Sequence, residues 1–198
     1  MSARLVWCLM LSLLLGATVA RGDGADAAST RLRSVQADFT QEKHLAILTR
    51  PLISRGTLAF QAPGSLRWEY LRPIHTVLLL HDGRIDKLIE RDGRFERDNG
   101  AGVDAMRTVL QDIGSWLDGR FGDNPLFAVS RTGAQTLVLT PREPGLETVI
   151  KRIELRLGAQ EGVMDRITIV EGDEAVTVLT FSQVILNRDI PAQRFAVP

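Results

Sequence analysis

The sequence predicts an α+β protein built on one antiparallel sheet of about ten to eleven short strands, with one N-terminal helix and one mid-chain helix. Apolar and polar residues alternate over many short segments, which is the pattern of strands with one buried face. Two Asp-Gly pairs, at residues 82–83 and 92–93, lie between such segments. One longer segment, residues 104–117, repeats apolar residues at helical spacing instead. Strands and helices do not alternate along the chain, so a parallel sheet is not expected.

The first 20 residues have the order of a secretory signal peptide. Arg4 precedes an almost wholly apolar run at residues 5–17, and small residues follow. The run is shorter than the roughly 20 apolar residues that a membrane-spanning helix needs. We therefore expect residues 1–20 to be removed, with cleavage near residues 20–22, and residues 21–198 to form a single domain.

The charge balance and the cysteine content of the chain exclude several classes of function and of covalent modification. The chain has 24 Lys+Arg and 24 Asp+Glu residues, so it has no basic field for non-specific nucleic-acid binding, and no nucleic-acid partner is expected. Its only cysteine, Cys8, lies inside the predicted signal peptide. The mature protein is therefore expected to carry no disulfide and no lipid anchor, and to depend on its core for stability.

The predicted sheet begins after a short helix at residues 27–35. Residues 35–42 then alternate, with Val35, Ala37 and Phe39 on one face. Asp-Gly between alternating segments predicts tight hairpin turns, because both turn residues need positive φ. The other predicted strands cover residues 54–61, 66–70, 76–80, 84–91, 136–140, 148–157, 164–170, 175–181, 184–186 and 195–197.

The mid-chain helix is predicted from a wide apolar face. Asp104 is placed to cap its start and Gly119 to end it. The face is formed by Met106, Val109, Leu110, Ile113, Trp116 and Leu117. Such a helix covers one face of a curved sheet, either as part of an ordinary core or as the cover of a ligand cavity. Composition leaves both interpretations open.

Recognisable catalytic and metal-binding motifs are absent from the sequence. Its three histidines, His44, His75 and His81, are scattered, and none has a second ligand at metal-binding spacing. Neither a nucleophile elbow nor a phosphate loop occurs. His81 and Asp82 form a possible base with its orienting carboxylate, but Asp82 is better explained as the first residue of a turn. We therefore predict no catalytic residues, no metal and no cofactor.

Six short motifs follow one another along the chain after the predicted signal peptide. They are Phe-Thr-Gln-Glu-Lys at residues 39–43, Ser-Arg-Gly-Thr-Leu-Ala-Phe at 54–60, Pro-Gly-Ser-Leu-Arg-Trp-Glu-Tyr-Leu-Arg-Pro at 63–73, a strand with its Asp-Gly turn at 78–84, Leu-Val-Leu-Thr-Pro-Arg at 137–142, and Phe-Ala-Val-Pro at 195–198. Their order and spacing resemble the outer-membrane lipoprotein carrier (LolA) family.

The resemblance implies a strongly curved antiparallel half-barrel, closed by a helical lid around an apolar cavity. It also implies a non-enzymatic, monomeric carrier in the periplasm. Such a carrier binds the acyl chains of lipoproteins or related lipids, receives them from an inner-membrane exporter and delivers them to an outer-membrane acceptor. The cavity is then expected to be lined by Phe39, Leu58, Phe60, Leu66, Trp68, Tyr70 and Leu79 from the sheet, and by Met106, Leu110, Ile113 and Trp116 from the lid.

Two departures from the family pattern bear on cargo and release. Ala62 stands at the lid-locking position, where family members carry an Arg that holds the lid, and we expect no C-terminal extension of the kind that some carriers have. Two alternatives therefore stay open. One is a carrier or sensor of the same fold for another amphiphile, such as a glycolipid. The other is a lipid-modifying enzyme that uses His81 and Asp82.

Overall fold

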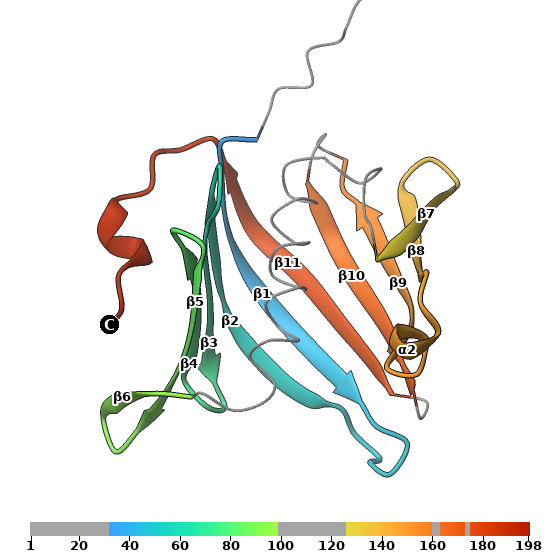
Figure 1. Cartoon of the computed structure of the whole chain (residues 1–198), viewed down its shortest axis with the longest axis horizontal. Coiled ribbons are helices and arrows are strands. Elements are labelled where there is room, and N and C mark those ends of the chain that lie inside the picture. Colours follow the sequence, from blue (N-terminus) through green and yellow to red (C-terminus); the bar gives the residue numbers. More distant parts are fainter. Residues whose placement is uncertain (1–31, 99–125, 160–162, 173–174) are drawn as a thin grey trace, which may run out of the picture.

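The computed structural model describes residues 32–98, 126–159, 163–172 and 175–198, which form an 11-stranded antiparallel sheet. The strand order is β6-β5-β4-β3-β2-β1-β11-β10-β9-β8-β7. Figure 1 shows an open, curved sheet, with the limb of β3–β5 and the limb of β7–β9 on opposite sides of the central strands. The elements are β1 (Ser34–His44), β2 (Leu52–Gln61), β3 (Ser65–Arg72), β4 (Thr76–His81), β5 (Arg84–Arg91), β6 (Arg94–Arg97), β7 (Phe127–Thr132), β8 (Thr136–Pro141), α2 (Pro144–Glu147), β9 (Ile150–Leu157), β10 (Met164–Glu171), β11 (Val176–Leu186) and η2 (Ala192–Phe195).

The pairing of β1 with β11 joins the two halves of the sheet, because every other neighbouring pair is consecutive in the chain. Phe39 lies opposite Phe181 in this ladder. The register shifts between Gln36 and Asp38, and Gln183 has a φ of 52°. The sequence pattern predicted two strands in this region, at residues 175–181 and 184–186. That division was wrong: one continuous strand runs through an irregularity that adds local twist.

The two Asp-Gly turns are confirmed. Asp82 and Gly83 have φ angles of 50° and 72°, and Asp92 and Gly93 have 49° and 76°. Positive φ at both positions matches the right-handed twist of the flanking strands, which is why such turns favour tight hairpins. The second turn adds β6 as the edge strand of the sheet.

The predictions at the two chain ends needed correction. Ser34 and Val35 already belong to β1, so the helix predicted at residues 27–35 does not reach its proposed end, and its first part lies outside the described residues. The strand predicted at residues 195–197 was wrong: Phe195 is the last residue of the 3-10 turn η2, and no strand follows it. Phe195 packs on Ala59 there, and an apolar anchor of this kind does not require a strand partner.

The predicted mid-chain helix and its lid residues Met106, Leu110, Ile113 and Trp116 lie outside the described residues. The closing lid therefore remains a prediction. Among the helices within the described ranges, none is long and apolar enough to cross a membrane.

Strand alternation gives the sheet two different faces. The concave face carries one large apolar cluster with members from every strand except β6, as far as the chain is described. The opposite, convex face carries two small clusters, one around Ala59 and one around Val77. Gly56 permits the tight curve of β2, because a Cβ at this position would lie 1.9 Å from the Glu69 carbonyl oxygen and 2.7 Å from Cζ of Phe39.

Candidate functional site

The candidate site is the concave face. Part of this face is formed by alternate side chains of β1, β2 and β3. Side chains at every second position of a strand share a face, so Leu66, Trp68 and Tyr70 of β3 point the same way. Five of the predicted lining residues are buried members of the concave cluster, and Tyr70 packs against it. The five are Phe39, Leu58, Phe60, Leu66 and Trp68.

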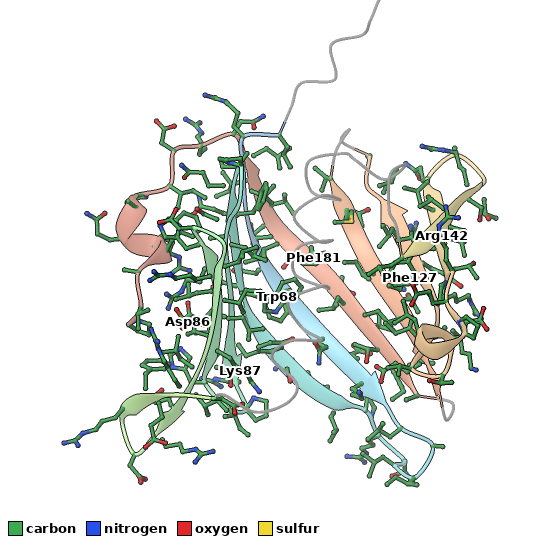
Figure 2. All side chains as sticks on the ribbon, in the orientation of Figure 1. Trp68, Asp86, Lys87, Phe127, Arg142 and Phe181 are labelled. Atoms are coloured by element: carbon green, nitrogen blue, oxygen red, sulfur yellow. The ribbon has the colours of Figure 1, made fainter. Side chains whose placement is uncertain are left out.

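Aromatic rings form the centre of this face. The ring of Phe39 lies with its centroid 4.9 Å from that of Trp68 and 5.1 Å from that of Tyr70. Phe181 of β11 contacts Trp68 edge-on at 6.2 Å. Figure 2 shows Trp68 and Phe181 inside the curve of the sheet. Phe181 was not among the predicted site residues, because its position depends on the long-range register of β1 and β11.

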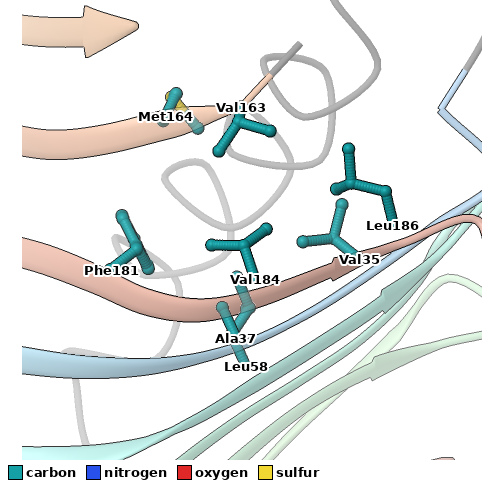
Figure 3. A pocket seen from close by; sticks show the side chains of 8 residues that line it. All are labelled: Val35, Ala37, Leu58, Val163, Met164, Phe181, Val184 and Leu186. Atoms are coloured by element: carbon teal, nitrogen blue, oxygen red, sulfur yellow. The ribbon is translucent and has the colours of Figure 1, made fainter. Parts of the chain in front are cut away.

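The part of the concave face beside this aromatic group is hollowed. Eight apolar side chains line the hollow, from β1 and β2 on one side to β10 and β11 on the other (Figure 3). They are Val35, Ala37, Leu58, Val163, Met164, Phe181, Val184 and Leu186. The hollow encloses about 20 Å³, which is room for about one water molecule.

Polar groups gather at one end of the concave face. The Tyr70 hydroxyl donates to Oε1 of Gln41 at 2.8 Å, and burial raises the pKa of Tyr70 to about 12. Further along β1, Nζ of Lys43 lies 3.0 Å from Glu171, which also accepts a 2.6 Å hydrogen bond from Thr177. Burial raises the pKa of Glu171, but these hydrogen bonds outweigh burial and lower it.

One buried donor on the concave face is poorly satisfied. Nε1 of Trp68 makes no hydrogen bond of good geometry within the described part of the chain, although only 4% of the residue is exposed. The Tyr70 hydroxyl is still near enough for this N–H to oppose part of the rise in the pKa of Tyr70. A buried indole N–H normally has a well-placed partner, and a ligand carbonyl at this position would supply one.

Two of the predicted site residues, Leu79 and Ala62, do not line the hollow. Leu79 was expected in the cavity, but it packs with Val77 and Leu88 on the convex face, so its predicted placement was wrong. Residues 77–80 are all apolar and buried, so alternation could not indicate which of them face inward. Ala62 packs against the concave cluster, and its backbone N–H donates to the Arg33 carbonyl at 2.9 Å. Its lid-locking role stays a prediction.

The convex face of β3 holds a buried charge network that the sequence did not indicate. Nε of Arg67 lies 2.8 Å from a carboxylate oxygen of Glu69, and both residues are buried. His75 bridges Glu69 at 2.8 Å and Glu90 at 2.7 Å. Arg194, from the C-terminal segment, approaches Glu69 to 3.8 Å. These contacts bind β3, β5 and the C-terminal segment together.

The network shifts two pKa values in opposite directions. Burial raises the pKa of Glu69, but hydrogen bonds from Arg67 and His75 and the charges of Arg67 and Arg194 outweigh it and lower the pKa from 4.5 to about 2. The hydrogen bond to Glu69 raises the pKa of His75 above its ordinary 6.5; burial opposes this rise, and the hydrogen bond to Glu90 adds to it. The network is therefore most complete when His75 is protonated and Glu69 is ionised.

A second polar group surrounds His81. Its Nδ1 lies 2.8 Å from Oγ of Ser65, its Nε2 lies 3.5 Å from Asp82, and its ring stacks on Phe195 at 6.2 Å. Serine, histidine and aspartate thus share one imidazole, but its two nitrogens are exchanged relative to acyl-transfer enzymes, in which Nε2 faces the serine and Nδ1 the aspartate. The Asp82 side chain is also 85% exposed, so water screens its charge and weakens its hold on the imidazole.

A known protein family matches one half of the sheet in sequence. Residues 30–90 match the family model of the outer membrane lipoprotein carrier protein LolA, which spans β1 to nearly the end of β5. No curated protein matched the sequence. Residues 30–90 are thus similar to the LolA family, and the match covers the part of the sheet that carries Phe39, Trp68 and Tyr70.

The solved structures that match this chain resemble it only weakly. A DUF1329 family protein from Desulfovibrio piger ATCC 29098 is 10% identical over 85% of this chain and 92% of its own, with a TM-score of 0.47. A LolA superfamily protein from Nitrosomonas europaea is 12% identical over 84% and 91%, with a TM-score of 0.45. The Pseudomonas aeruginosa MucA/MucB complex gives 16% identity over 83% and 56%, with a TM-score of 0.37. These values are too low to bear on function.

Proposed function

We propose that this LolA-like protein carries the acyl chains of lipoproteins or related lipids on its concave face. The observation that supports this most directly is the continuous apolar cluster that runs across both limbs and surrounds an apolar hollow. Contacts with such a face are non-directional, so they suit aliphatic chains of varied length.

The free-energy scale explains why a carrier is needed. Each CH₂ group moved from a bilayer into water costs about 0.8 kcal/mol, so a chain of roughly 15 methylenes resists leaving the membrane by about 12 kcal/mol. A protein that offers nearly equivalent apolar surface removes most of this barrier. Transfer then runs toward whichever acceptor holds the cargo more tightly, without local ATP.

We further propose an orientation for the cargo. The acyl chain lies along the apolar centre of the concave face, beside Phe39 and Phe181. The polar head lies at the end where Gln41, Lys43 and Glu171 gather, because a head group there keeps its hydrogen bonds. An ester or amide carbonyl of the cargo near Trp68 would give its indole N–H a better-placed acceptor than the protein supplies.

The cellular setting belongs to the same proposal. We propose that residues 1–20 are removed as a signal peptide and that the mature chain acts in the periplasm as a monomer, between an inner-membrane donor and an outer-membrane acceptor. The protein acts there without catalysis or cofactor. A carrier for another amphiphile, such as a glycolipid, would use the same face, and native mass spectrometry of protein from its own periplasm would identify the cargo by mass.

Two neighbouring residues of β11 provide the test. Val184 lines the hollow, whereas Ile185 is exposed and does not line it. Val184→Phe should fill the hollow and weaken fatty-acid binding, measured by calorimetry, about tenfold or more, which is the size of an ordinary overpacking penalty. Ile185→Phe is the matched control and should bind as the unmodified mature chain does. Equal affinity of both variants, with folding intact, would remove the concave face as the cargo site.

A further inference from the structure

The exposed apolar side chains are concentrated at one end of the sheet. Among the described residues, nine large hydrophobic side chains are exposed, and six of them lie on the β1–β2 hairpin tip or at the β3–β4 turn. The six are Ile47, Leu48, Leu52, Ile53, Leu71 and Ile74. We call this set the apolar rim. The two turns are neighbours, because Arg55 of β2 lies opposite Arg72 of β3.

The rim is a projection. Ile47 is 89% exposed at the end of the hairpin, where the backbone N–H of Leu48 donates to the Leu45 carbonyl at 2.9 Å to close a turn. Figure 1 shows this hairpin extending beyond the end of the sheet. A projecting apolar tip cannot receive a peptide as a groove does, but it can enter a soft surface that closes around it.

Unpaired cations flank the rim. Arg50, Arg55 and Arg72 are exposed, and none of them has an ion pair or side-chain hydrogen bond within the described ranges. Arg55 and Arg72 are direct cross-strand neighbours, and like charges in such positions repel each other. An anion that lies between the two guanidinium groups would relieve this repulsion. Lys43, by contrast, is already neutralised by Glu171.

Apolar tips with arginines behind them match the layers of a bilayer surface. Apolar side chains enter the acyl region, and long cationic side chains reach the phosphates above it. We propose that the apolar rim docks on the surface of a lipid bilayer that contains anionic phospholipids. The polar end of the concave face, at Gln41 and Lys43, lies at the same end of β1. Docking would therefore bring the opening of the site to the membrane, although the docking itself does not depend on any cargo.

Vesicle flotation tests the proposal directly. The mature chain, residues 21–198, should float with phosphatidylcholine vesicles that contain phosphatidylglycerol, and less with vesicles of phosphatidylcholine alone. The double variant I47S/L48S should bind about 100-fold more weakly to both, because two apolar side chains no longer enter the bilayer. The control Ile185→Ser removes an exposed apolar side chain at the opposite end of β11 and should bind normally.

The arginines give a second, separate readout. The double variant R55Q/R72Q should bind about 30-fold more weakly to vesicles with phosphatidylglycerol and unchanged to phosphatidylcholine alone. All substituted positions are exposed, and unchanged thermal melting will verify folding.

The proposal is overturned if the mature chain does not float with either vesicle, or if I47S/L48S floats as the unmodified chain does. A protein as the true partner of the rim would give the first of these results. Fatty-acid affinity in solution, measured on the same variants, should not change. If the unmodified chain does not bind fatty acid, the carrier function is refuted, whereas the conclusion from the vesicles still holds.

Discussion

The concave and convex faces of the same β-strands differ in how far their side chains find partners within the protein. On the concave face, β1, β2 and β3 present Phe39, Leu58 and Trp68 to a cluster that continues across to the opposite limb. On the convex face, β3 presents Arg67 and Glu69, which are sealed by a network and by the C-terminal segment. The polar groups of the convex face are thus satisfied internally, whereas the concave face keeps an apolar hollow and an indole N–H that makes no hydrogen bond of good geometry in the described part of the chain. The convex face therefore serves stability, whereas the concave face is the one on which we propose that cargo binds.

Removing the central carboxylate of the network should have the largest effect. Glu69→Gln leaves the buried Arg67 guanidinium without a counter-charge, and breaking a buried pair in this way costs about 3–5 kcal/mol. Denaturant unfolding should show this loss, while fatty-acid affinity of the folded fraction stays unchanged. Glu96→Gln is the control: its 3.8 Å contact with Arg91 is exposed, and its removal should cost well under ~1 kcal/mol. A larger effect on binding than on stability would show that the two faces are not separate.

Gly56→Ala should distort the concave face by displacing the backbone of β2. The new Cβ would overlap the Glu69 carbonyl and the Phe39 ring, so β2 must move away from β3. We expect a destabilisation of about 3 kcal/mol and weaker fatty-acid binding together. Gly64→Ala is the matched control, because a Cβ there meets nothing within 4 Å. A Gly56→Ala protein that keeps its stability would mean that the tight curve of β2 is not required.

The pH dependence of stability should report on the convex network. His75 binds its proton more tightly in the folded chain, so its stabilisation is complete below pH 6.5 and is lost as the pH rises through its raised pKa. Glu69 behaves oppositely: its stabilisation is complete above pH 4.5 and is lost as the pH falls toward about 2. Melting temperatures measured across this range should decline at both ends.

His75→Gln should remove the decline at the upper end and leave the acid decline largely in place. The variant still provides hydrogen-bonding groups between Glu69 and Glu90, but it carries no titrating charge. The same pH dependence in His75→Gln and in the unmodified chain would show that another group controls the upper limit.

Local features of this fold could be predicted from the sequence, and long-range features could not. Alternation placed Leu66, Trp68 and Tyr70 on one face, and the Asp-Gly pairs gave the hairpins, because both signals arise within a few residues. The pairing of Phe39 with Phe181 joins distant segments and has no local signal. Residues 77–80 are buried on both faces, so the sequence could not indicate that Leu79 faces outward. The bridge from His75 to Glu90 likewise depends on how β3, β4 and β5 come together.

The smallest expected effect concerns Ser65, and it separates a carrier from a lipid-modifying enzyme. Its hydroxyl contacts His81, whose contact with the exposed Asp82 is 3.5 Å long, so the chain of contacts is solvated at its end. Ser65→Ala should therefore change stability by no more than about 0.5 kcal/mol, as at an ordinary surface site. Ser130→Ala, which loses a 3.4 Å contact with the Val138 carbonyl, is the control. Incubation of the mature chain with a phospholipid should return the lipid unchanged for the unmodified chain and for both variants, because Asp82 is too exposed to hold His81 as a general base. Ester hydrolysis that Ser65→Ala abolishes and Ser130→Ala preserves would move the chemistry to this group and end the assignment of function to the concave face alone.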